Sequence, residues 1–360
     1  MSDEPLPEPD RAPGAPHPRD ALGVEGQAQA VTDFLSAARA GRLHHAWLLT
    51  GPRGTGKATM AWAMAKWLLA GGTPDSLWTD PETPVARRIR ALSEPRLQLV
   101  RRPLDEKSGR LRAEITVDEI RKLQSFFHMS ASEGGHRVAI IDAADEMNPA
   151  AANALLKQLE EPPKDAVLIL VAHQPGRLLP TIRSRCRELR LHPLAPSDMA
   201  SILEQMAIGE DAERLSALAG GSAGEAIRLA SQGGVELYQK IIRLFADYPE
   251  IDRRAAAGIS EVAAARPSAE GDPFDLVVTL LDRFLTRAAR TGLLGAPLPE
   301  AAEGEAELLT RLSPDQRAAQ IWAAAQAELS ARARAGRAVN LDPSALVMDM
   351  LIGLANQQVT

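Results

Sequence analysis

The chain has 360 residues, which is enough for two or three domains with hydrophobic cores of their own. Its 41 basic and 47 acidic residues give a net charge of −6, which excludes a protein that coats nucleic acid through bulk charge, although not a local basic patch. No apolar run approaches the roughly 18–20 residues of a membrane span, and the acidic, proline-rich start does not resemble a secretion signal. A single cysteine, Cys186, excludes an intrachain disulfide framework and a multi-cysteine zinc site. These features predict a globular, cytoplasmic protein.

The first segment of the chain, residues 1–20, contains six prolines and few large apolar side chains. Such a segment buries too little apolar surface to offset the entropy that it loses on ordering, so we expect a disordered tail over residues 1–20. From Ala21 the pattern changes, and Gln27–Ala40 is typical of an amphipathic helix.

Three short apolar runs follow, and each ends in a polar or glycine-rich turn. They are Trp47–Leu49, Val138–Ile141 and Val167–Val171. Runs that are apolar throughout are typical of strands buried on both faces of a parallel sheet. Helical patterns occur between and around them, at Ala58–Leu69, Val117–Phe127 and Ala150–Glu160. The alternation predicts an α/β module with a doubly wound parallel sheet and flanking helices over residues 21–192.

After Pro193 the strand patterns disappear. Three short helical patterns follow, at Ser197–Met206, Ala212–Ala219 and Gly224–Ala230. They predict a small all-α domain over residues 193–234, followed by a second all-α domain over residues 235–360. Two stretches interrupted by Pro and Gly, Ala255–Gly271 and Thr291–Glu305, are expected to be loops.

A phosphate-binding loop is predicted at residues 51–57, which read Gly-Pro-Arg-Gly-Thr-Gly-Lys between a predicted strand and a predicted helix. Glycines let the backbone curl so that N–H groups point at phosphate oxygens, and Lys57 reaches the outer phosphates. The alternative is a glycine-rich turn that holds no ligand. The candidate nucleotide-binding residues are Gly51, Gly54, Thr55, Gly56, Lys57, Ala58, Thr59 and Asp142.

The ligands for Mg²⁺ in this motif are incomplete. The motif usually places Ser or Thr after the lysine, because the hydroxyl binds Mg²⁺. Ala58 stands there instead, and Thr59 points about 100° further around the helix. Asp142 follows a predicted strand and fits the acid that holds Mg²⁺ through water, with an ordinary strand-ending aspartate as the alternative. Binding of ATP or ADP therefore stays open.

Several further motifs resemble the clamp-loader branch of the AAA+ proteins. They are Gly26-Gln27, Asn153–Lys157, Leu159–Pro163 and Ser184-Arg185-Cys186. The resemblance is strong from Ala21 to Pro193 and moderate to Ala230, and Asn340–Pro343 resembles the last collar helix of the same family. It implies an AAA+ P-loop module followed by a helical lid and a C-terminal helical collar. Within the branch the chain is most similar to the delta-prime type of subunit of bacterial DNA polymerase III.

Departures from the family pattern concern the parts that hydrolyse ATP. In the hydrolysing subunits a glutamate after the strand-ending aspartate polarises water, and alignment on Asn153 places Ala143 there. Gly224 replaces an arginine of the lid, and His173 occupies a sensor position that is usually Thr or Asn. Together with Ala58, these changes imply a subunit descended from an ATPase that no longer turns over.

The arginine of Ser-Arg-Cys is presented, in related clamp loaders, to ATP bound by the neighbouring subunit. The resemblance therefore implies that Arg185, with Ser184 beside it, acts in trans as an arginine finger. The alternative is an ordinary surface arginine, because 34 of the 41 basic residues are arginines. Cys186 lacks an evident His or Asn partner, so we expect a small hydrophobic residue rather than a nucleophile.

A zinc module with four cysteines often follows the phosphate loop in this family, but Gly71–Arg112 contains no cysteine. The sequence therefore predicts no zinc and no other metal site. Seven arginines in this stretch form either a phosphate-facing patch or, as we favour, a solvated face. They are Arg87, Arg88, Arg90, Arg101, Arg102, Arg110 and Arg112.

The resemblance implies a non-hydrolysing subunit of the DNA polymerase III clamp loader, which helps to place the sliding clamp on primed DNA. Its expected partners are the tau/gamma-type and delta-type subunits, the sliding clamp and, through the complex, primer–template DNA, but no membrane. Apolar stripes at Phe274–Ala289 and Leu346–Leu354 are buried either in the domain's own core, which we favour for most of them, or against partner helices. We predict that residues 235–360 are an assembly module. The alternatives are an active motor that uses Lys57 and Asp142, and a scaffold outside replication.

Overall fold

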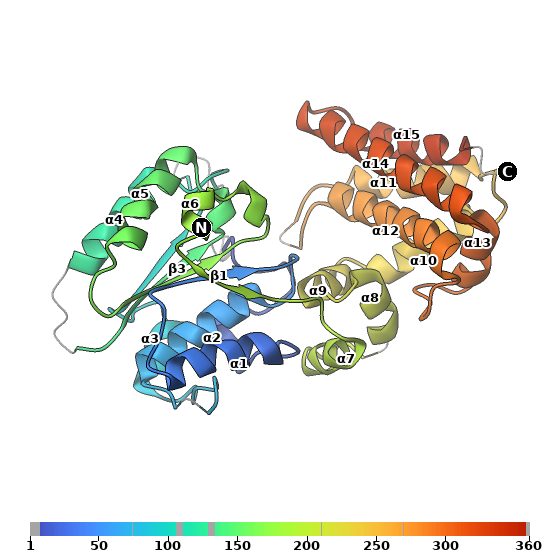
Figure 1. Cartoon of the computed structure of the whole chain (residues 1–360). Coiled ribbons are helices and arrows are strands. Elements are labelled where there is room, and N and C mark those ends of the chain that lie inside the picture. Colours follow the sequence, from blue (N-terminus) through green and yellow to red (C-terminus); the bar gives the residue numbers. More distant parts are fainter. Residues whose placement is uncertain are drawn as a thin grey trace, which may run out of the picture. The chain divides into compact units, whose positions relative to one another are not determined.

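The computed structural model describes residues 8–73, 75–105, 111–128, 134–209, 211–268 and 270–357. Residues 1–7 of the expected tail lie outside the described residues. The chain divides into two compact units between Asp198 and Met199. The first unit consists of a sheet with helices, and the elements of the second unit are helices (Figure 1).

The sheet of the first unit has five strands in the order β2-β3-β4-β1-β5, and all neighbouring strands are parallel. The strands are β1 (Ala46–Thr50), β2 (Leu97–Arg101), β3 (Arg137–Asp142), β4 (Ala166–Val171) and β5 (Arg187–Arg190). The central strands β1 and β4 are buried throughout, which confirms the predicted apolar strands. The sequence did not indicate β2 and β5, because these edge strands carry polar and partly exposed side chains.

Helices cover both faces of this sheet (Figure 1). They are η1 (Pro18–Asp20), α1 (Ala28–Arg39), α2 (Lys57–Ala70), α3 (Pro84–Arg90), α4 (Val117–His128), η2 (Ala144–Glu146), α5 (Pro149–Glu160), η3 (Pro175–Arg177) and α6 (Pro180–Arg183). Phe34 and Trp62 belong to the cluster that joins α1 and α2 to one face, and Leu123 and Leu155 to the cluster that joins α4 and α5 to the other. The α/β fold predicted for this part is confirmed.

The prediction of a disordered tail is wrong for residues 8–20. The fully buried carboxylate of Asp10 lies 2.6 Å from Arg101 Nη1 and 3.1 Å from His17 Nε2. His17 is only 3% exposed and packs edge-on against Trp62 of α2. The partners of this segment stand far along the chain, so its proline-rich composition gave no sign of the burial that they provide.

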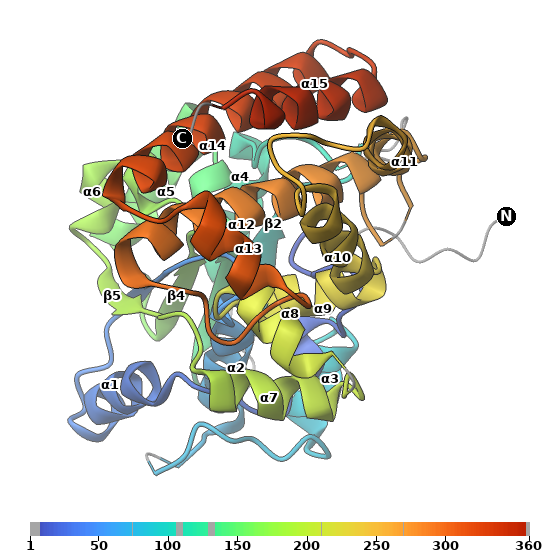
Figure 2. The same ribbon diagram turned by 90° about the vertical axis from the view of Figure 1, so that its right-hand side faces the viewer.

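The second unit begins inside α7 (Pro196–Gln205) and has no strand in the part that the structure describes. Its further helices are α8 (Ala212–Ala219), α9 (Ala223–Ser231), α10 (Gly234–Leu244), α11 (Arg253–Ala263), α12 (Pro273–Leu294), α13 (Glu305–Leu312), α14 (Gln316–Ala338) and α15 (Pro343–Ala355). The long helices α12 and α14 lie side by side (Figures 1 and 2). The division does not separate the expected lid from the expected collar, so those boundaries stay a prediction.

Two predicted loops are correct only in part. The first half of Ala255–Gly271 is helical, because Ala256, Ile259 and Ala263 bury one face of α11. Its high alanine content favours a helix, and the side chain of Asp252 caps the helix by accepting a hydrogen bond from the backbone N–H of Arg254 at 2.8 Å. In the second stretch, Thr291–Glu305, α12 continues to Leu294, and the predicted loop is confirmed from Gly295 to Gly304.

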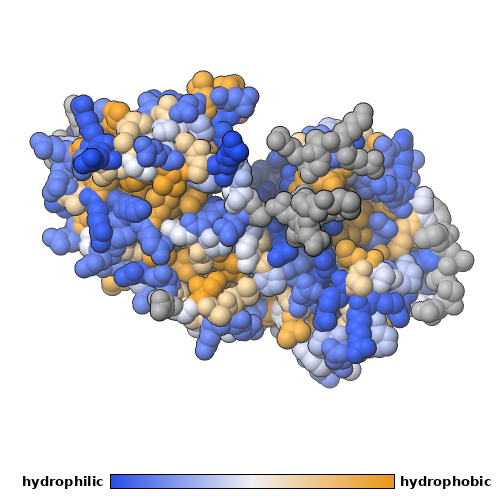
Figure 3. All heavy atoms as spheres, turned by 180° about the vertical axis from the view of Figure 1, so that it is seen from behind, coloured by the Kyte–Doolittle hydropathy of each residue, from blue (hydrophilic) through white to orange (hydrophobic). Residues whose placement is uncertain are grey.

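Among the described residues, no helix is both long and apolar enough to cross a membrane. Apolar residues on the face seen in Figure 3 form separate patches among hydrophilic ones.

A buried carboxylate joins three parts of the second unit. Glu305 at the start of α13 is fully buried, and its Oε1 accepts hydrogen bonds from Tyr238 Oη at 2.6 Å and Arg287 Nε at 2.5 Å. Its Oε2 accepts from Arg287 Nη2 at 2.7 Å and from the backbone N–H of Ala301 at 2.6 Å. Burial, and then the charge of Glu305, raises the pKa of Tyr238. The Glu305 carboxylate is therefore the shared hydrogen-bond acceptor of Tyr238, Arg287 and the backbone N–H of Ala301.

We expect Glu305→Ala to lower the free energy of unfolding by about 3–5 kcal/mol, because it leaves the Arg287 guanidinium and the Tyr238 hydroxyl buried without their acceptor. Chemical denaturation followed by circular dichroism measures the change. The exposed neighbour Glu307 provides the control, and Glu307→Ala should cost under about 1 kcal/mol. Equal stability of the two variants would contradict this account of the network.

Candidate functional site

The phosphate loop connects the end of β1 to the start of α2, as predicted. Gly54 and Gly56 have φ angles of 74° and 91°, in the region that side chains disfavour. Gly51 has a φ of 136°, and a Cβ atom there would lie 2.3 Å from the carbonyl oxygen of Leu191. The glycines are therefore required by the backbone path and by close packing, whether or not a nucleotide binds.

Lys57 is folded back onto its own loop. Its Nζ donates hydrogen bonds to the carbonyl oxygens of Gly51 at 2.7 Å and Pro52 at 2.5 Å, and the residue is only 3% exposed. Thr55 Oγ1 also donates to Pro52 O, at 2.9 Å. Burial lowers the pKa of Lys57 to about 8, although Asp142 and Asp145 oppose the shift. Two of the three N–H donors of the ammonium group are thus used by the loop itself, and one is left for a phosphate oxygen.

Two aspartates at the end of β3 lie near this lysine. Burial, and then the charges of Asp10 and Glu146, raises the pKa of Asp142 to about 7. Asp145 is bound to the turn after β4, because Oδ1 accepts from the backbone N–H of His173 at 3.0 Å and Oδ2 from that of Gln174 at 2.8 Å. Both oxygens of Asp145 hold the backbone, so this residue does not replace the missing glutamate.

His173 stays neutral at pH 7, because burial, and then the charges of Lys57 and Arg53, lowers its pKa to about 4. Its Nδ1 is buried and has no hydrogen-bond partner among the described residues. Arg53 extends from the loop to Glu146, with 3.4 Å between Nη2 and Oε1. Arg53 and Asp145 were not among the predicted site residues, although their positions in the loop and three residues after Asp142 are visible in the sequence.

Gln27 anchors the phosphate loop to the segment after β5. Its Nε2 donates to the carbonyl oxygens of Thr55 at 3.1 Å and His192 at 2.8 Å, and its Oε1 accepts from the backbone N–H of His192 at 3.2 Å. Gly26 beside it has a φ of 68°, and a Cβ atom there would lie 2.5 Å from Leu194 Cδ2. The sequence shows these two residues only as a matching motif, because their partners are distant in it.

Arg185 and Ser184 lie at the opposite edge of the sheet from the phosphate loop. Strand β5 pairs in parallel with β1, with Trp47 opposite Arg187 and Thr50 opposite Arg190. The turn before β5 is therefore at the amino edge of the sheet, and the loop after β1 is at the carboxyl edge. Roughly 10 Å of strand separates the two edges, at about 3.3 Å per residue. The structure thus groups residues 51–59 with Asp142, but not with Arg185.

The side chain of Arg185 is bound within the chain. Its Nη2 lies 2.9 Å from Oε1 of Glu160, the last residue of α5, and its Nη1 donates to the carbonyl oxygen of Thr181 at 3.0 Å. Ser184 Oγ donates to the same carbonyl oxygen at 3.2 Å. Cys186 is half-buried against the core cluster under α5, and burial raises its pKa to about 12.

The arginines of Gly71–Arg112 are largely paired with carboxylates. Each described member of the seven has an acidic partner within 4.0 Å, namely Arg87–Glu82, Arg88–Glu94, Arg90–Asp20, Arg101–Asp10, Arg102–Glu146 and Arg112–Asp105. Arg110 lies outside the described residues. These pairings occupy the arginines with carboxylates of the chain itself, which disfavours a phosphate-facing patch. The solvated face fits Arg87, Arg90 and Arg112, whereas Arg101 binds the fully buried carboxylate of Asp10.

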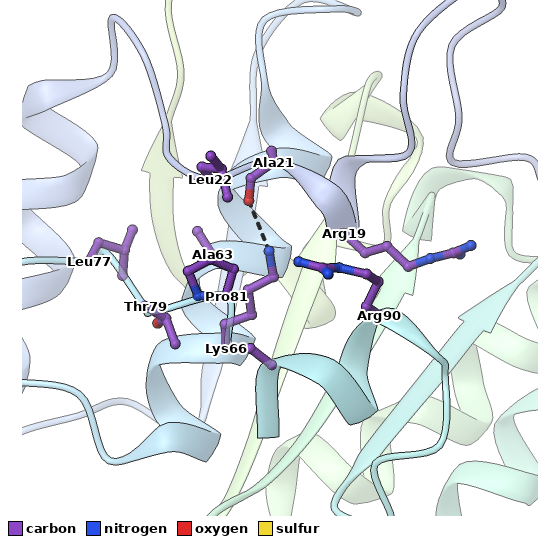
Figure 4. A pocket seen from close by; sticks show the side chains of 10 residues that line it. Arg19, Ala21, Leu22, Ala63, Lys66, Leu77, Thr79, Pro81 and Arg90 are labelled. Atoms are coloured by element: carbon purple, nitrogen blue, oxygen red, sulfur yellow. Dashed lines mark hydrogen bonds between the residues drawn. The ribbon is translucent and has the colours of Figure 1, made fainter. Parts of the chain in front are cut away.

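A small cavity beside α2 is not a ligand site. Figure 4 shows Lys66 and Arg90 at this cavity, where Lys66 Nζ donates to the carbonyl oxygen of Ala21 at 2.9 Å. The cavity has a volume of about 10 Å³, which leaves room for roughly one water molecule and not for a larger ligand. In the described ranges, no group of three or more His, Cys, Asp or Glu side chains is arranged to hold a metal ion.

The thiol of Cys186 should react slowly while the protein is folded. A thiol with a pKa of about 12 holds roughly 10³-fold less reactive thiolate at pH 8 than one at the ordinary value of 9.0. We expect alkylation by iodoacetamide at pH 8 to be about 10²–10³-fold slower in the folded protein than in urea, and to accelerate as the pH rises toward 11. Mass spectrometry measures the rate, and comparable rates in the folded and unfolded protein would contradict the expected burial.

Comparisons with known proteins identify relatives of the first unit. Residues 26–195 match the model of the family described as DNA polymerase III, delta subunit. DNA polymerase III subunit delta' of Pseudomonas aeruginosa is 40% identical over 204 residues, which cover 55% of this chain and 59% of that protein. The same subunit of Bacillus subtilis is 35% identical over 207 residues, with coverages of 57% and 59%.

A third relative is the DNA polymerase III subunit gamma/tau of Mycobacterium bovis, which is 31% identical over 187 residues. This match covers 51% of the present chain and 30% of that protein. The chain thus spans 59% of the length of the delta' proteins that it matches. The similarity to the delta-prime type is confirmed over the module that contains the phosphate loop.

Proposed function

We propose that this chain, whose residues 26–195 match the model of the family described as DNA polymerase III, delta subunit, is a clamp-loader subunit that does not itself hydrolyse ATP. The observation that carries the proposal is the placement of Arg185 and Lys57 at opposite edges of one parallel sheet. An arginine at that edge is out of reach of its own phosphate loop. It is available to a nucleotide that another subunit holds.

The phosphate loop lacks the parts that hydrolysis requires. Ala58 offers no hydroxyl to Mg²⁺, and Ala143 offers no carboxylate to an attacking water. Lys57 is already bound to two carbonyl oxygens of its loop. A loop of this kind supports binding of ATP or ADP without turnover, or no binding at all. The loop residues and Asp142 remain the candidate nucleotide site, and we propose no zinc or other metal centre.

The proposed role of Arg185 is to stabilise the charge that develops on phosphoryl oxygens in a neighbouring site. A guanidinium group offers several N–H donors in a plane that matches phosphate oxygens. The relatives include both delta' and gamma/tau subunits, which supports a neighbour of the tau/gamma type. Ser184 would act beside it by holding the turn that carries the arginine.

The further partners and the domain roles follow from the same proposal. Within the complex, this chain would contact a delta-type subunit, the sliding clamp and primer–template DNA. The complex would act in the cytoplasm, where DNA is replicated. Residues 21–192 would form the AAA+ module, residues 193–234 the lid and residues 235–360 the collar that joins the subunits. The long helices α12 and α14, which pack side by side, would form part of this collar.

One observation favours an alternative function as an active motor. Lys57 and Asp142 are retained, and their charges interact in the folded protein. An ATPase needs these two residues, whereas a scaffold does not. The alternative is tested by turnover of the chain on its own.

The purified chain should hydrolyse ATP at the rate of a blank, because it lacks the Mg²⁺ hydroxyl and the water-polarising carboxylate. A coupled steady-state assay with and without Mg²⁺ measures the rate, and Lys57→Ala serves as the matched control. A turnover of about 1 s⁻¹ or more that Lys57→Ala abolishes would establish the motor instead. Nucleotide binding without turnover agrees with the proposal.

Arg185→Ala should slow ATP hydrolysis by the loader reconstituted with tau/gamma-type and delta-type subunits. An arginine finger contributes roughly 10³–10⁵-fold at the site that it serves, and the loss for the whole complex is smaller because other sites remain. Arg185→Lys should restore little, since a point charge does not reproduce the planar fork. Arg183 is an exposed arginine two residues away, and Arg183→Ala is the control that should leave hydrolysis unchanged. Unchanged hydrolysis with Arg185→Ala at equal assembly would reject the role in trans.

A further inference from the structure

The end of helix α5 is packed tightly against the turn that carries Arg185. Leu159 in the last turn of α5 and Ile182 in α6 are 2% and 0% exposed, and both belong to the same core cluster. Glu160 follows Leu159, and Arg185 lies three residues after Ile182. The core therefore fixes the backbone positions from which Glu160 and Arg185 meet.

The two contacts of the Arg185 side chain fix the plane of its guanidinium group. Nη2 lies 2.9 Å from Glu160 Oε1, and Nη1 donates to Thr181 O at 3.0 Å. One acceptor is a side chain of α5 and the other is a backbone carbonyl of α6. Two acceptors on different elements leave the planar group with little freedom to rotate.

Donors remain for a second ligand. A guanidinium group has five N–H donors, and these contacts use one on each terminal nitrogen. The Nε–H and one N–H on each terminal nitrogen are left, and the side chain is 36% exposed. Arg185 can therefore keep both contacts while it binds a phosphate oxygen.

Stability does not explain this ion pair. The Glu160 side chain is 50% exposed, and ion pairs that exposed contribute little to folding because water screens them. The ion pair can instead contribute by holding the long Arg185 side chain in one orientation. An arginine that is already ordered loses less entropy when it meets its ligand than one that moves freely.

We propose that Glu160 is a positioning residue, which holds Arg185 in the orientation that receives a phosphate group of a nucleotide bound by the neighbouring subunit. The inference rests on the proposed role of Arg185 and extends it to a residue of another helix. Glu160 acts through Arg185 and does not itself contact the nucleotide.

The test uses the reconstituted loader with this full chain as Glu160→Ala, Glu160→Gln or Glu161→Ala, and measures kcat and KM for ATP at equal assembly. Glu160→Ala should lower kcat at the affected site roughly threefold to tenfold, with KM unchanged, a smaller loss than that of Arg185→Ala. Glu160→Gln should retain most of the activity, because it keeps the Oε1 acceptor. The exposed Glu161, whose side chain makes no interaction in the described part of the chain, is the control.

The double variant Arg185→Ala/Glu160→Ala separates positioning from other effects. If Glu160 acts through Arg185, adding Glu160→Ala to Arg185→Ala changes nothing further. An unchanged or raised kcat for Glu160→Ala overturns the inference, as does an equal loss in the Arg185→Ala background. In both cases the role of Arg185 stands if Arg185→Ala alone slows the loader. If Arg185→Ala has no effect, the proposed function and this inference fail together.

Discussion

The parallel pairing of β1 with β5 determines where chemistry can occur in the first unit. Because both strands run the same way, the loop that follows β1 and the turn that precedes β5 are held at opposite edges of the sheet. Lys57 belongs to the first and Arg185 to the second. Arg185 is bound at its own edge by Glu160 and by the carbonyl oxygen of Thr181, so we expect joint use of the two features to involve more than one subunit.

The phosphate loop is stabilised from within and from outside. Lys57 and Thr55 bind carbonyl oxygens of the loop, while Gln27 connects Thr55 to the segment after β5. Asp145 in turn holds the end of β4 through two backbone N–H groups. A chain with alanine at positions 58 and 143 can still keep this loop, because the loop connects strands and helices of the module.

Much of the fold was predictable from the sequence, because buried strands and amphipathic helices leave local patterns. The apolar β4 and the glycine-rich loop before Lys57 are examples. Contacts between distant segments leave no local pattern. The burial of Asp10 by Arg101 and the anchoring of Thr55 by Gln27 join residues 91 and 28 positions apart. The motif likewise indicates Arg185, but nothing in the sequence singles out Glu160. Glu160 ends α5, and its side chain contacts Arg185 just after α6.

The role of Arg185 in trans is best tested by a structure of the assembled loader with a non-hydrolysable ATP analogue. The quantity to measure is the distance from the guanidinium nitrogens of Arg185 to the nearest phosphate oxygen. The account predicts a hydrogen-bond distance of about 2.7–3.0 Å to a nucleotide held by the neighbouring subunit. Arg185 pointing into solvent, with every bound nucleotide beyond its reach, would contradict it.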